Sequence, residues 1–420
     1  MIETHKPAER AFIVGVKLQH DSEDEVKESL EELASLVDTA GAEVIESFIQ
    51  NKTKVNPVFF IGKGKMEEIK AFAEDAKIDT IIFDTELSPS QIKNLENAMD
   101  KKILDRSWVI LDIFASRAKT KEAKTQVELA QLKYFMPRLT RQWTHLSRQA
   151  GGGVGTKGPG ETQLETDKRM IREKITQLEK ELEEISKQRD IRRRGRENTF
   201  KVILVGYTNV GKSTLMNKLS NAGVLAENRL FATLDSTTRT IELENKKSFL
   251  LSDTVGFIKK LPHNLVASFK STLEEVTEAD LLLHVIDLSH NNFTEQMKTV
   301  EKVLEELKAN DKKTLYVFNK ADSVDLEEIG YKIDSQYKDN AVYISAQTGW
   351  NVDSLINKIV EVMEEDYVIK ELELKHSDSK LISAIHGFSE ILEEEYLEDI
   401  VKIKYKANLV NNKYIESLMK

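Results

Sequence analysis

Three short stretches, in a fixed order along the chain, carry residues that could bind a phosphorylated nucleotide. Residues 206–213 read GYTNVGKS and fit the pattern G-x-x-x-x-G-K-[ST]. In this pattern backbone N–H groups cradle phosphates, while the lysine and the hydroxyl residue meet the outer phosphates and Mg²⁺. Residues 253–256 read DTVG, and residues 319–322 read NKAD. A glycine-containing turn could explain the first stretch alone, but the three together predict a GTPase.

The first two stretches supply groups for phosphate and for a hard cation. Lys212 is expected to span the β- and γ-phosphates, where its charge offsets the charge that builds during transfer. Gly206 and Gly211 would let the backbone approach phosphate without a Cβ. Ser213 and Asp253 are predicted ligands of Mg²⁺, Asp253 through water, because this ion prefers oxygen donors and keeps several waters.

The third stretch predicts the choice of guanine. Asp322 can accept hydrogen bonds from N1–H and from the 2-amino group of guanine. Adenine has neither of these two donors. Adenine would therefore leave a carboxylate unpaired, which is penalised. Asn319 and Lys320 are expected to brace the loop and the base, while residues 345–347 (SAQ) offer backbone N–H to guanine O6.

Two segments are expected to respond to the γ-phosphate. Gly256 would offer its N–H to this group, so that the segment can sense hydrolysis. Residues 230–239 read LFATLDSTTR, and one threonine here is expected to coordinate Mg²⁺ and the γ-phosphate only in the GTP state. Thr233 is our choice because FATL resembles the FTTL stretch of Obg-type GTPases. Spacing alone does not separate it from Thr237 or Thr238.

The residues expected to contact the nucleotide come from these motifs and from the segment between them: Gly206, Tyr207, Thr208, Asn209, Val210, Gly211, Lys212, Ser213, Thr214, Phe231, Ala232, Thr233, Leu234, Asp235, Asp253, Thr254, Val255, Gly256, Asn319, Lys320, Ala321, Asp322, Ser345, Ala346 and Gln347. Catalytic roles are expected for Lys212, Thr233, Gly256 and Asn209. Mg²⁺ coordination is expected for Ser213, Thr233 and Asp253.

The residue that follows the DTVG motif lacks a group that hydrolysis needs. In Ras-like proteins a glutamine directly follows the DxxG element and orients the attacking water. Here that residue is Phe257, which can neither donate nor accept, so we expect slow intrinsic hydrolysis and a partner or another group that organises the water. Asn209 resembles the asparagine of potassium-stimulated GTPases, in which K⁺ replaces an arginine finger. The alternative is an asparagine satisfied by its own loop.

Composition excludes several classes of protein. The chain has 420 residues, no cysteine and eight scattered histidines, which argues against disulfides and against thiolate or histidine metal sites. We find no apolar run of membrane-spanning length and no signal-peptide core in MIETHKPAER. We therefore expect a cytoplasmic protein. We also expect a monomer that binds no DNA and associates at most weakly with membranes.

The sequence divides into four predicted regions, and two of them have the pattern of α/β domains. Residues 1–115 alternate strand-like and helix-like runs, which predicts an N-terminal α/β domain. Its stretch 59–70 resembles a phosphate loop but lacks the Walker spacing, so we interpret it as a plain helix start. Residues 198–365 carry apolar runs that end in polar motifs, which predicts a doubly wound, mostly parallel sheet with its site at the carboxyl edge.

The other two regions are a helical hairpin and a small C-terminal domain. In residues 116–197 apolar residues step by three and four in two stripes, which predicts two long helices, the first kinked at Pro137. Between them residues 151–160 are rich in glycine and form the predicted tip. Residues 366–420 are expected to form a small α/β domain, with a half-buried strand at 401–406.

The hairpin region is basic within an acidic chain. The net charge is −10, yet residues 117–157 carry nine basic residues and two acidic ones. Basic clusters of this kind can bind phosphate backbones, and a solvated helix face is the alternative. A basic hairpin with a glycine-rich tip suits contact with RNA.

The sequence resembles the HflX family of GTPases, in the Obg–HflX superfamily, over nearly the whole chain. The matching stretches are FFIGKGK (59–65), the run from ILDRSW to LTRQW (103–143), GGGVGTKGPGETQLETDKR (151–169), GYTNVGKSTLMNKL (206–219), FATLDSTTR (231–239) and DTVGFIKKLPHNLVASFKSTLEEV (253–276). The glycine-rich stretch distinguishes this family, because the GTP motifs are common to many. Ser236 stands where many relatives have proline.

The resemblance implies a function as well as a fold. It implies a Mg²⁺-dependent GTPase that binds the large ribosomal subunit and its rRNA, and splits stalled or idle ribosomes in its GTP state. Hydrolysis to GDP would then release it. Two alternatives remain open at this stage: an ATP-dependent RNA helicase working from the N-terminal domain, and an rRNA-binding scaffold that nucleotide merely stabilises.

Overall fold

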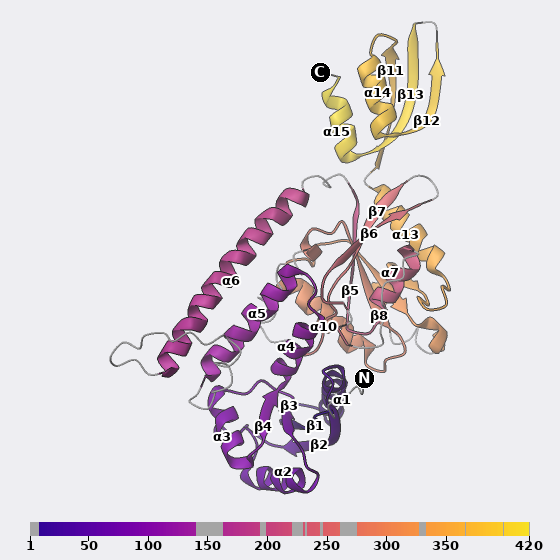
Figure 1. The fold of residues 1–420 in the computed structure, drawn as a ribbon. Coiled ribbons are helices and arrows are strands. Elements are labelled where there is room, and N and C mark those ends of the chain that lie inside the picture. Colours follow the sequence, from indigo (N-terminus) through magenta and orange to yellow (C-terminus); the bar gives the residue numbers. More distant parts are fainter. Residues whose placement is uncertain are drawn as a thin grey trace, which may run out of the picture.

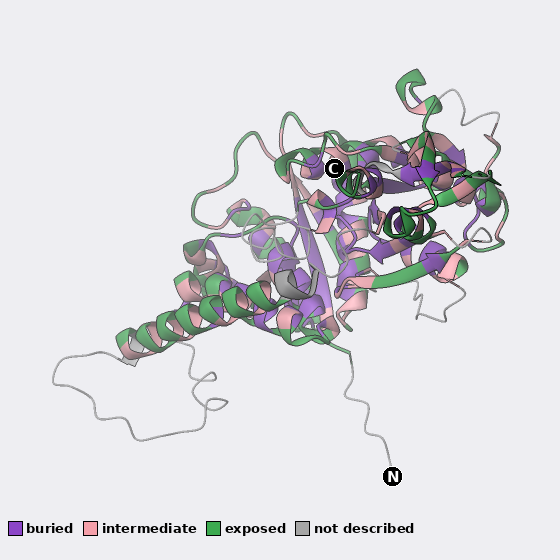
Figure 2. Cartoon of the chain, turned by 90° about the horizontal axis from the view of Figure 1, so that it is seen from above, coloured by how far each residue is buried: buried purple, intermediate pink, exposed green. Residues whose placement is uncertain are grey.

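Three sheets and a pair of long helices make up the part of the chain that the computed structural model describes (Figure 1). The described residues are 8–139, 163–193, 199–220, 230–231, 233–243, 247–260, 275–326, 333–365, 367–397 and 399–419. Figure 2 shows the buried residues concentrated in the sheets and the helices packed on them, whereas the long helix on the left is mostly exposed or intermediate.

The N-terminal domain is a parallel α/β sheet in the order β2-β1-β3-β4. Ser22 and Ser88 each begin a helix with a capping box, in which the serine hydroxyl and the third helical residue satisfy each other's backbone N–H groups. The stretch 59–70 forms the start of α2, with Gly62 at the N-cap. The elements are β1 (Arg10–Lys17), α1 (Glu23–Thr39), β2 (Glu43–Asn51), α2 (Lys63–Asp75), β3 (Thr80–Phe83), α3 (Pro89–Met99) and β4 (Lys102–Asp105).

The helices that follow are α4 (Arg106–Arg117), α5 (Lys121–Phe135), the 3₁₀ turn η1 (Met136–Arg138) and α6 (Gln163–Arg193). Helices α5 and α6 run side by side, with ion pairs Lys121–Glu181 and Lys174–Glu128 between them (Figure 1).

The expected kink at Pro137 was wrong. The helix ends at Phe135 instead, and Pro137 lies in the 3₁₀ turn, because proline lacks the N–H that would continue the α-helix. The part of the predicted hairpin from 140 to 162, which includes the tip at 151–160, lies outside the described residues. Within the described part of the chain, no helix combines the length and the apolar character needed to cross a membrane.

The nucleotide domain has a sheet in the order β10-β9-β8-β5-β7-β6, which confirms the predicted doubly wound, mostly parallel fold. Strand β6 pairs antiparallel with β7, and the other pairs in this sheet are parallel. The elements are β5 (Lys201–Gly206), α7 (Lys212–Ser220), β6 (Thr237–Glu242), β7 (Ser248–Asp253), β8 (Leu281–Asp287), α10 (Phe293–Glu306), β9 (Thr314–Asn319), η4 (Ala321–Ser323), α12 (Ser335–Lys338), β10 (Ala341–Tyr343) and α13 (Val352–Glu365).

The C-terminal domain is an antiparallel three-stranded sheet with two helices. The predicted half-buried strand at 401–406 is confirmed, because Val401, Ile403 and Tyr405 are fully buried while the lysines between them are partly exposed. The elements are β11 (Tyr367–Lys375), α14 (Ser379–Phe388), β12 (Glu390–Tyr396), β13 (Ile400–Asn408) and α15 (Leu409–Ser417).

The N-terminal and nucleotide domains share one continuous apolar cluster, which runs from α1, α4 and α5 into the sheet around β5. A buried charge lies at the same boundary. Arg106, the first residue of α4, is 1% exposed and pairs with Glu32 of α1 and with Asp84 after β3. Its Nη1 also donates to the carbonyl of Ser29 at 3.3 Å. Three segments of the N-terminal domain therefore meet on one guanidinium.

Arg106→Met tests the weight of this guanidinium. Removing it would leave two carboxylates without their main partner, so we expect the free energy of unfolding to fall by about 3 kcal/mol. The first urea unfolding transition measures this change. Lys102→Met is the matched control, because Lys102 pairs with Glu9 where both side chains are about half exposed, and it should cost less than about 1 kcal/mol. Equal losses in the two variants would contradict the argument.

Candidate nucleotide-binding site

The three motifs and the SAQ stretch meet at one edge of the six-stranded sheet. The loop 206–213 follows β5, Asp253 ends β7, Asn319 ends β9, and residues 345–347 follow β10. These strands are parallel, so their carboxyl ends lie at the same edge. Asp287 ends β8 at this edge as well. It was not among the predicted residues, although its apolar run, LLLHVID, also ends in a polar residue.

Glycine is required at two positions of the loop for steric reasons. Gly206 has φ +152°, and a Cβ there would lie 2.3 Å from the carbonyl oxygen of Val285. Gly211 has φ +96°, and its Cβ would lie 2.3 Å from Nδ2 of Asn319. Both contacts are far shorter than van der Waals distance, so the loop can take this path only without side chains.

Lys212 is a buried ammonium with carbonyl partners. It is 6% exposed, and its Nζ donates to the carbonyl oxygens of Gly206 at 3.1 Å and Tyr207 at 2.7 Å. Burial lowers the pKa of Lys212 to about 8, against an opposing effect of Asp253. An anion beside this nitrogen would favour its charged form, which suits a group that binds phosphate.

Three oxygen donors converge next to Lys212. The Ser213 hydroxyl donates to Asp253 at 2.7 Å, the Thr233 hydroxyl donates to the same carboxylate oxygen at 2.9 Å, and the two hydroxyls lie 2.9 Å apart. The other oxygen of Asp253, Oδ1, is buried without a hydrogen bond to the described residues. Burial raises the pKa of Asp253. Two hydroxyls and a carboxylate are donors that fit Mg²⁺.

Only one of the three candidate threonines lies at this point. Thr233 contacts Ser213 and Asp253, whereas Thr237 begins β6 and the Thr238 hydroxyl lies 2.8 Å from the hydroxyl of Ser252.

A pocket of about 490 Å³ opens beside the loop, where NKAD and SAQ face each other. Asn319 joins three segments there, since its Nδ2 donates to the carbonyl of Val210 at 2.8 Å and its Oδ1 accepts from the N–H of Ala346 at 2.9 Å. Asp322 lines the pocket, and a hydrogen bond from Ser345 lowers the pKa of its carboxyl. The pocket is lined by Asn209, Gly211, Thr214, Asn319, Lys320, Asp322, Ser323, Ser345, Ala346 and Gln347.

Several predicted contact residues direct their side chains elsewhere. The Thr254 hydroxyl donates to the carbonyl of Leu204 at 2.7 Å, inside the core. Phe231 packs edge-on against Phe114 of α4, and Asp235 bonds to the α4–α5 junction. Tyr207 keeps its backbone in the loop, while its hydroxyl donates to Glu32 of α1.

The remaining predicted residues lie at the rim of the site or in the core. Lys320 adopts the left-handed conformation, and its Nζ contacts Asp287 at 2.5 Å. Leu234, Val255 and Ala321 are buried. Ala232 lies outside the described residues. The residues from α1 and from the α4–α5 junction that touch this region were missed, and no motif or spacing in the sequence pointed to them.

Family models match three consecutive parts of the chain. Residues 27–115 match a GTP-binding GTPase N-terminal model, and residues 117–196 match the model of a GTP-binding GTPase middle region. Residues 201–320 match a model described as a 50S ribosome-binding GTPase.

Full-length relatives decide the family. The GTPase HflX of Flavobacterium psychrophilum is 47% identical over 86% of this chain and 92% of its own length. The GTPase HflX of Escherichia coli is 42% identical over 95% of this chain and 93% of its own. The chain belongs to the HflX family of GTPases. It is accordingly a GTP hydrolase. Its GTP-binding motifs lie at the carboxyl edge of the six-stranded sheet.

Solved structures include GTP-binding proteins of lower identity. A GTP-binding protein from the archaeon Sulfolobus solfataricus, in complex with GDP, is 27% identical over 84% of this chain and 98% of its own, with a TM-score of 0.45. The SsGBP–GDP complex is 28% identical over the same share of this chain, with a TM-score of 0.48.

Gly256→Ala tests the crowded γ-phosphate side of the site. A Cβ at Gly256 would lie 2.8 Å from the Cα of Thr208 and 3.0 Å from Nζ of Lys212, so the segment must shift. We expect GTP turnover to fall about a hundredfold, as when one preorganised donor is lost, while GDP binding persists. Gly64→Ala is the control, because a Cβ there meets nothing within 4 Å. Unchanged turnover in Gly256→Ala would contradict the assigned role of the Gly256 N–H.

Asp322→Asn tests the choice of base. The asparagine amide would oppose the 2-amino group of guanine, so we expect GTP affinity to fall roughly 10- to 100-fold. The same amide can donate to the 2-oxo group of xanthine, so the affinity for xanthosine triphosphate should rise. Competition against a fluorescent nucleotide measures both. Asp311→Asn, an exposed residue of the same domain, should change neither affinity. A variant that still prefers GTP would count against this role of Asp322.

Proposed function

We propose that this GTPase is a switch that binds the large ribosomal subunit and its rRNA in the GTP state and splits stalled or idle ribosomes. GTP hydrolysis, with Mg²⁺ held by Ser213, Thr233 and Asp253, then releases it. The match of residues 201–320 to a 50S ribosome-binding GTPase model supports the partner. The observation that carries the switch is the direct contact between the Thr233 loop and the base of the helical pair.

Residues on both sides of Thr233 in the sequence make this contact. Phe231 lies against Phe114 of α4, with ring centroids 4.7 Å apart. Asp235 accepts hydrogen bonds from the backbone N–H of Lys119 at 2.9 Å and of Thr120 at 3.3 Å, and from the Thr120 hydroxyl. Helix α4 and the N-terminal cap of α5 are therefore both in contact with the loop that carries Thr233.

Thr120 links the loop to the helical pair. Its hydroxyl oxygen accepts from the N–H of Ala123 and so caps the N-terminus of α5, while its hydrogen is donated to Asp235. If GTP and Mg²⁺ fix Thr233, the loop position is fixed as well, and α5 is held at its first turn. Hydrolysis would remove that constraint. In this way the state of the nucleotide can reach the hairpin whose predicted tip, 151–160, we assign to contact with rRNA.

The remaining parts of the proposal follow from the sequence. We assign residues 1–115, 116–197, 198–365 and 366–420 to four domains of a cytoplasmic monomer that binds no DNA. Because Phe257 cannot orient water, the ribosome is proposed to complete the catalytic arrangement. K⁺ near Asn209 is a second candidate, because this ion would supply the positive charge that an arginine finger supplies in other GTPases.

The first test measures GTP turnover alone and with purified large subunits, in K⁺ and in Na⁺ at equal ionic strength. We expect strong stimulation by subunits, and a K⁺ preference if Asn209 holds that ion. Light scattering of whole ribosomes with a non-hydrolysable GTP analogue measures splitting. Subunits that bind without changing turnover would refute the coupled switch and favour a scaffold.

Thr120→Asp tests the link between loop and hairpin. The aspartate keeps an oxygen to cap α5 but replaces the donated hydrogen with a charge that repels Asp235. We expect unchanged basal turnover and a roughly tenfold lower stimulation by subunits, since about 1.4 kcal/mol corresponds to a factor of ten. Ser88→Asp makes the same change at the cap of α3 and should leave stimulation intact. Full stimulation of Thr120→Asp would remove the link.

A further inference from the structure

Tyr207, the second residue of GYTNVGKS, joins the phosphate loop to the N-terminal domain. Its carbonyl oxygen remains in the loop and accepts from Nζ of Lys212 at 2.7 Å. Its side chain turns the other way, is 5% exposed, and donates its hydroxyl hydrogen to Glu32 of α1. Burial raises the pKa of Tyr207, so the phenol keeps this hydrogen at neutral pH.

The same hydroxyl holds the segment that follows the DxxG motif. Its oxygen accepts a hydrogen bond from the backbone N–H of Lys259 at 2.7 Å. Phe257 is tied to the loop through its main chain, because its N–H donates to the carbonyl of Gly206 at 3.1 Å and its carbonyl accepts from the N–H of Thr208 at 2.8 Å. Residues 257–259 are thus fixed at both ends.

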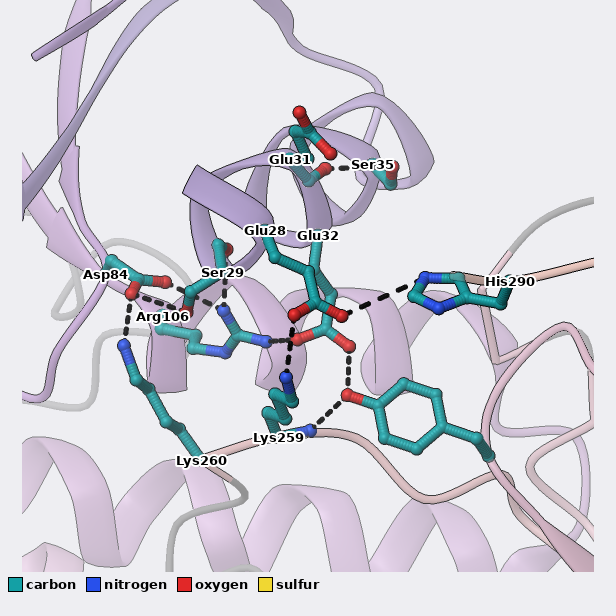
Figure 3. Close-up of polar contacts among 11 residues, drawn as sticks. Glu28, Ser29, Glu31, Glu32, Ser35, Asp84, Arg106, Lys259, Lys260 and His290 are labelled. Carbon is teal, nitrogen blue, oxygen red and sulfur yellow. Dashed lines mark hydrogen bonds and ion pairs between the residues drawn. The ribbon is translucent and has the colours of Figure 1, made fainter. Parts of the chain in front are cut away.

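The N-terminal side of this contact is also fixed (Figure 3). The second carboxylate oxygen of Glu32 pairs with buried Arg106, and Arg106 binds Asp84 at 2.7 Å. Asp84 accepts from Ser29 at 2.7 Å and from Nζ of Lys260. These contacts close a ring, which we call the interdomain ring: Tyr207, Glu32, Arg106, Asp84, Lys260 and Lys259.

A second contact beside the ring holds the side chain of Lys259. Its Nζ pairs with Glu28 of α1 at 3.0 Å (Figure 3). Glu28 also accepts from the side-chain amide of Asn292 at 2.8 Å. His290 lies 3.9 Å from the other oxygen of Glu28. Lys259 is therefore bound to α1 through its side chain and, by way of Tyr207, through its backbone.

The segment held in this way carries the group expected at the γ-phosphate. Gly256 immediately precedes Phe257, and a Cβ built on it would lie only 3.0 Å from Nζ of Lys212. Phe257 is 2% exposed and has no polar side-chain atom for the attacking water. Catalysis on this side of the site then depends on where the backbone N–H of Gly256 is held, because donors fixed in advance need no rearrangement as charge develops.

We propose that Tyr207 and Glu32 are positioning residues for GTP hydrolysis, and that the N-terminal domain completes the GTPase centre by holding residues 256–259 against the phosphate loop. Neither side chain touches the nucleotide in this role. Tyr207 acts through the N–H of Lys259, and Glu32 acts through Tyr207.

Tyr207→Phe tests this role in the full chain without ribosomes, since the inference concerns intrinsic hydrolysis. The variant removes one oxygen atom and keeps the buried ring. We expect kcat for GTP to fall about tenfold, equivalent to about 1.4 kcal/mol of transition-state stabilisation, with KM and GDP affinity unchanged. Loss of structure alone would instead lower GDP affinity together with kcat. The control is Tyr316→Phe on β9, which removes a hydroxyl that donates to Glu301 of α10 and should keep the kcat of the natural protein.

Glu32 supplies a second, independent readout. Glu32→Gln retains an acceptor for the Tyr207 hydroxyl and should restore most of the kcat that Glu32→Ala loses. Both changes break the hydrogen bond between Tyr207 and Glu32, and Glu32→Ala also removes a partner of Arg106. Combining Glu32→Ala with Tyr207→Phe should therefore lower kcat by less than the product of the two single losses. The proposal is overturned if Tyr207→Phe hydrolyses GTP at the natural rate or faster, or if the two losses multiply.

Discussion

The pairing of β5 with β7 on one side and β8 on the other is the constraint on which the nucleotide site depends. The parallel register sets Leu204 opposite Asp253 and Gly206 opposite Val285. The phosphate loop therefore begins where the DxxG strand ends, and the carboxylate of Asp253 lies level with the last residues of β5. The same pairing brings the carbonyl of Val285 so close that residue 206 can only be glycine. Steric exclusion by the sheet and recognition of phosphate thus require the same residue.

Much of this arrangement could be predicted from the sequence because strand ends in a parallel sheet are tied to apolar runs. The apolar runs predicted in residues 198–365 form the parallel strands β5, β7, β8, β9 and β10, and the carboxyl ends of these strands share one edge. Strand β6 was not predicted, because TTRTIE lies at the sheet edge with most side chains exposed and so shows little apolar pattern. The interdomain ring could not be predicted either. It joins residues from Glu32 to Lys260, and no periodicity or spacing connects positions so far apart in the chain.

The boundary between the N-terminal domain and the nucleotide domain combines two kinds of contact with different effects. The shared apolar cluster removes surface from water and is tolerant of small shifts. The interdomain ring is directional, and its members Arg106, Glu32 and Asp84 are largely buried, so a shift leaves these groups unpaired. Apolar burial can hold the two domains together, while the ring defines one position of α1 relative to the phosphate loop. Glu32 and Lys259 of the ring also line a pocket together with residues 207–210 of the phosphate loop.

The position of Arg106 also has a consequence for the order of events during synthesis. Its partners Glu32, Asp84 and Ser29 all precede it, so the N-terminal domain can complete this charge pairing as soon as α4 has left the ribosome. Lys259 and Lys260 follow about 150 residues later, roughly eight to thirty seconds at about 5–20 residues per second. The nascent DxxG segment therefore emerges after its acidic partners on α1 and after β3, and the N-terminal domain can serve as a template on which this part of the GTPase centre takes its shape.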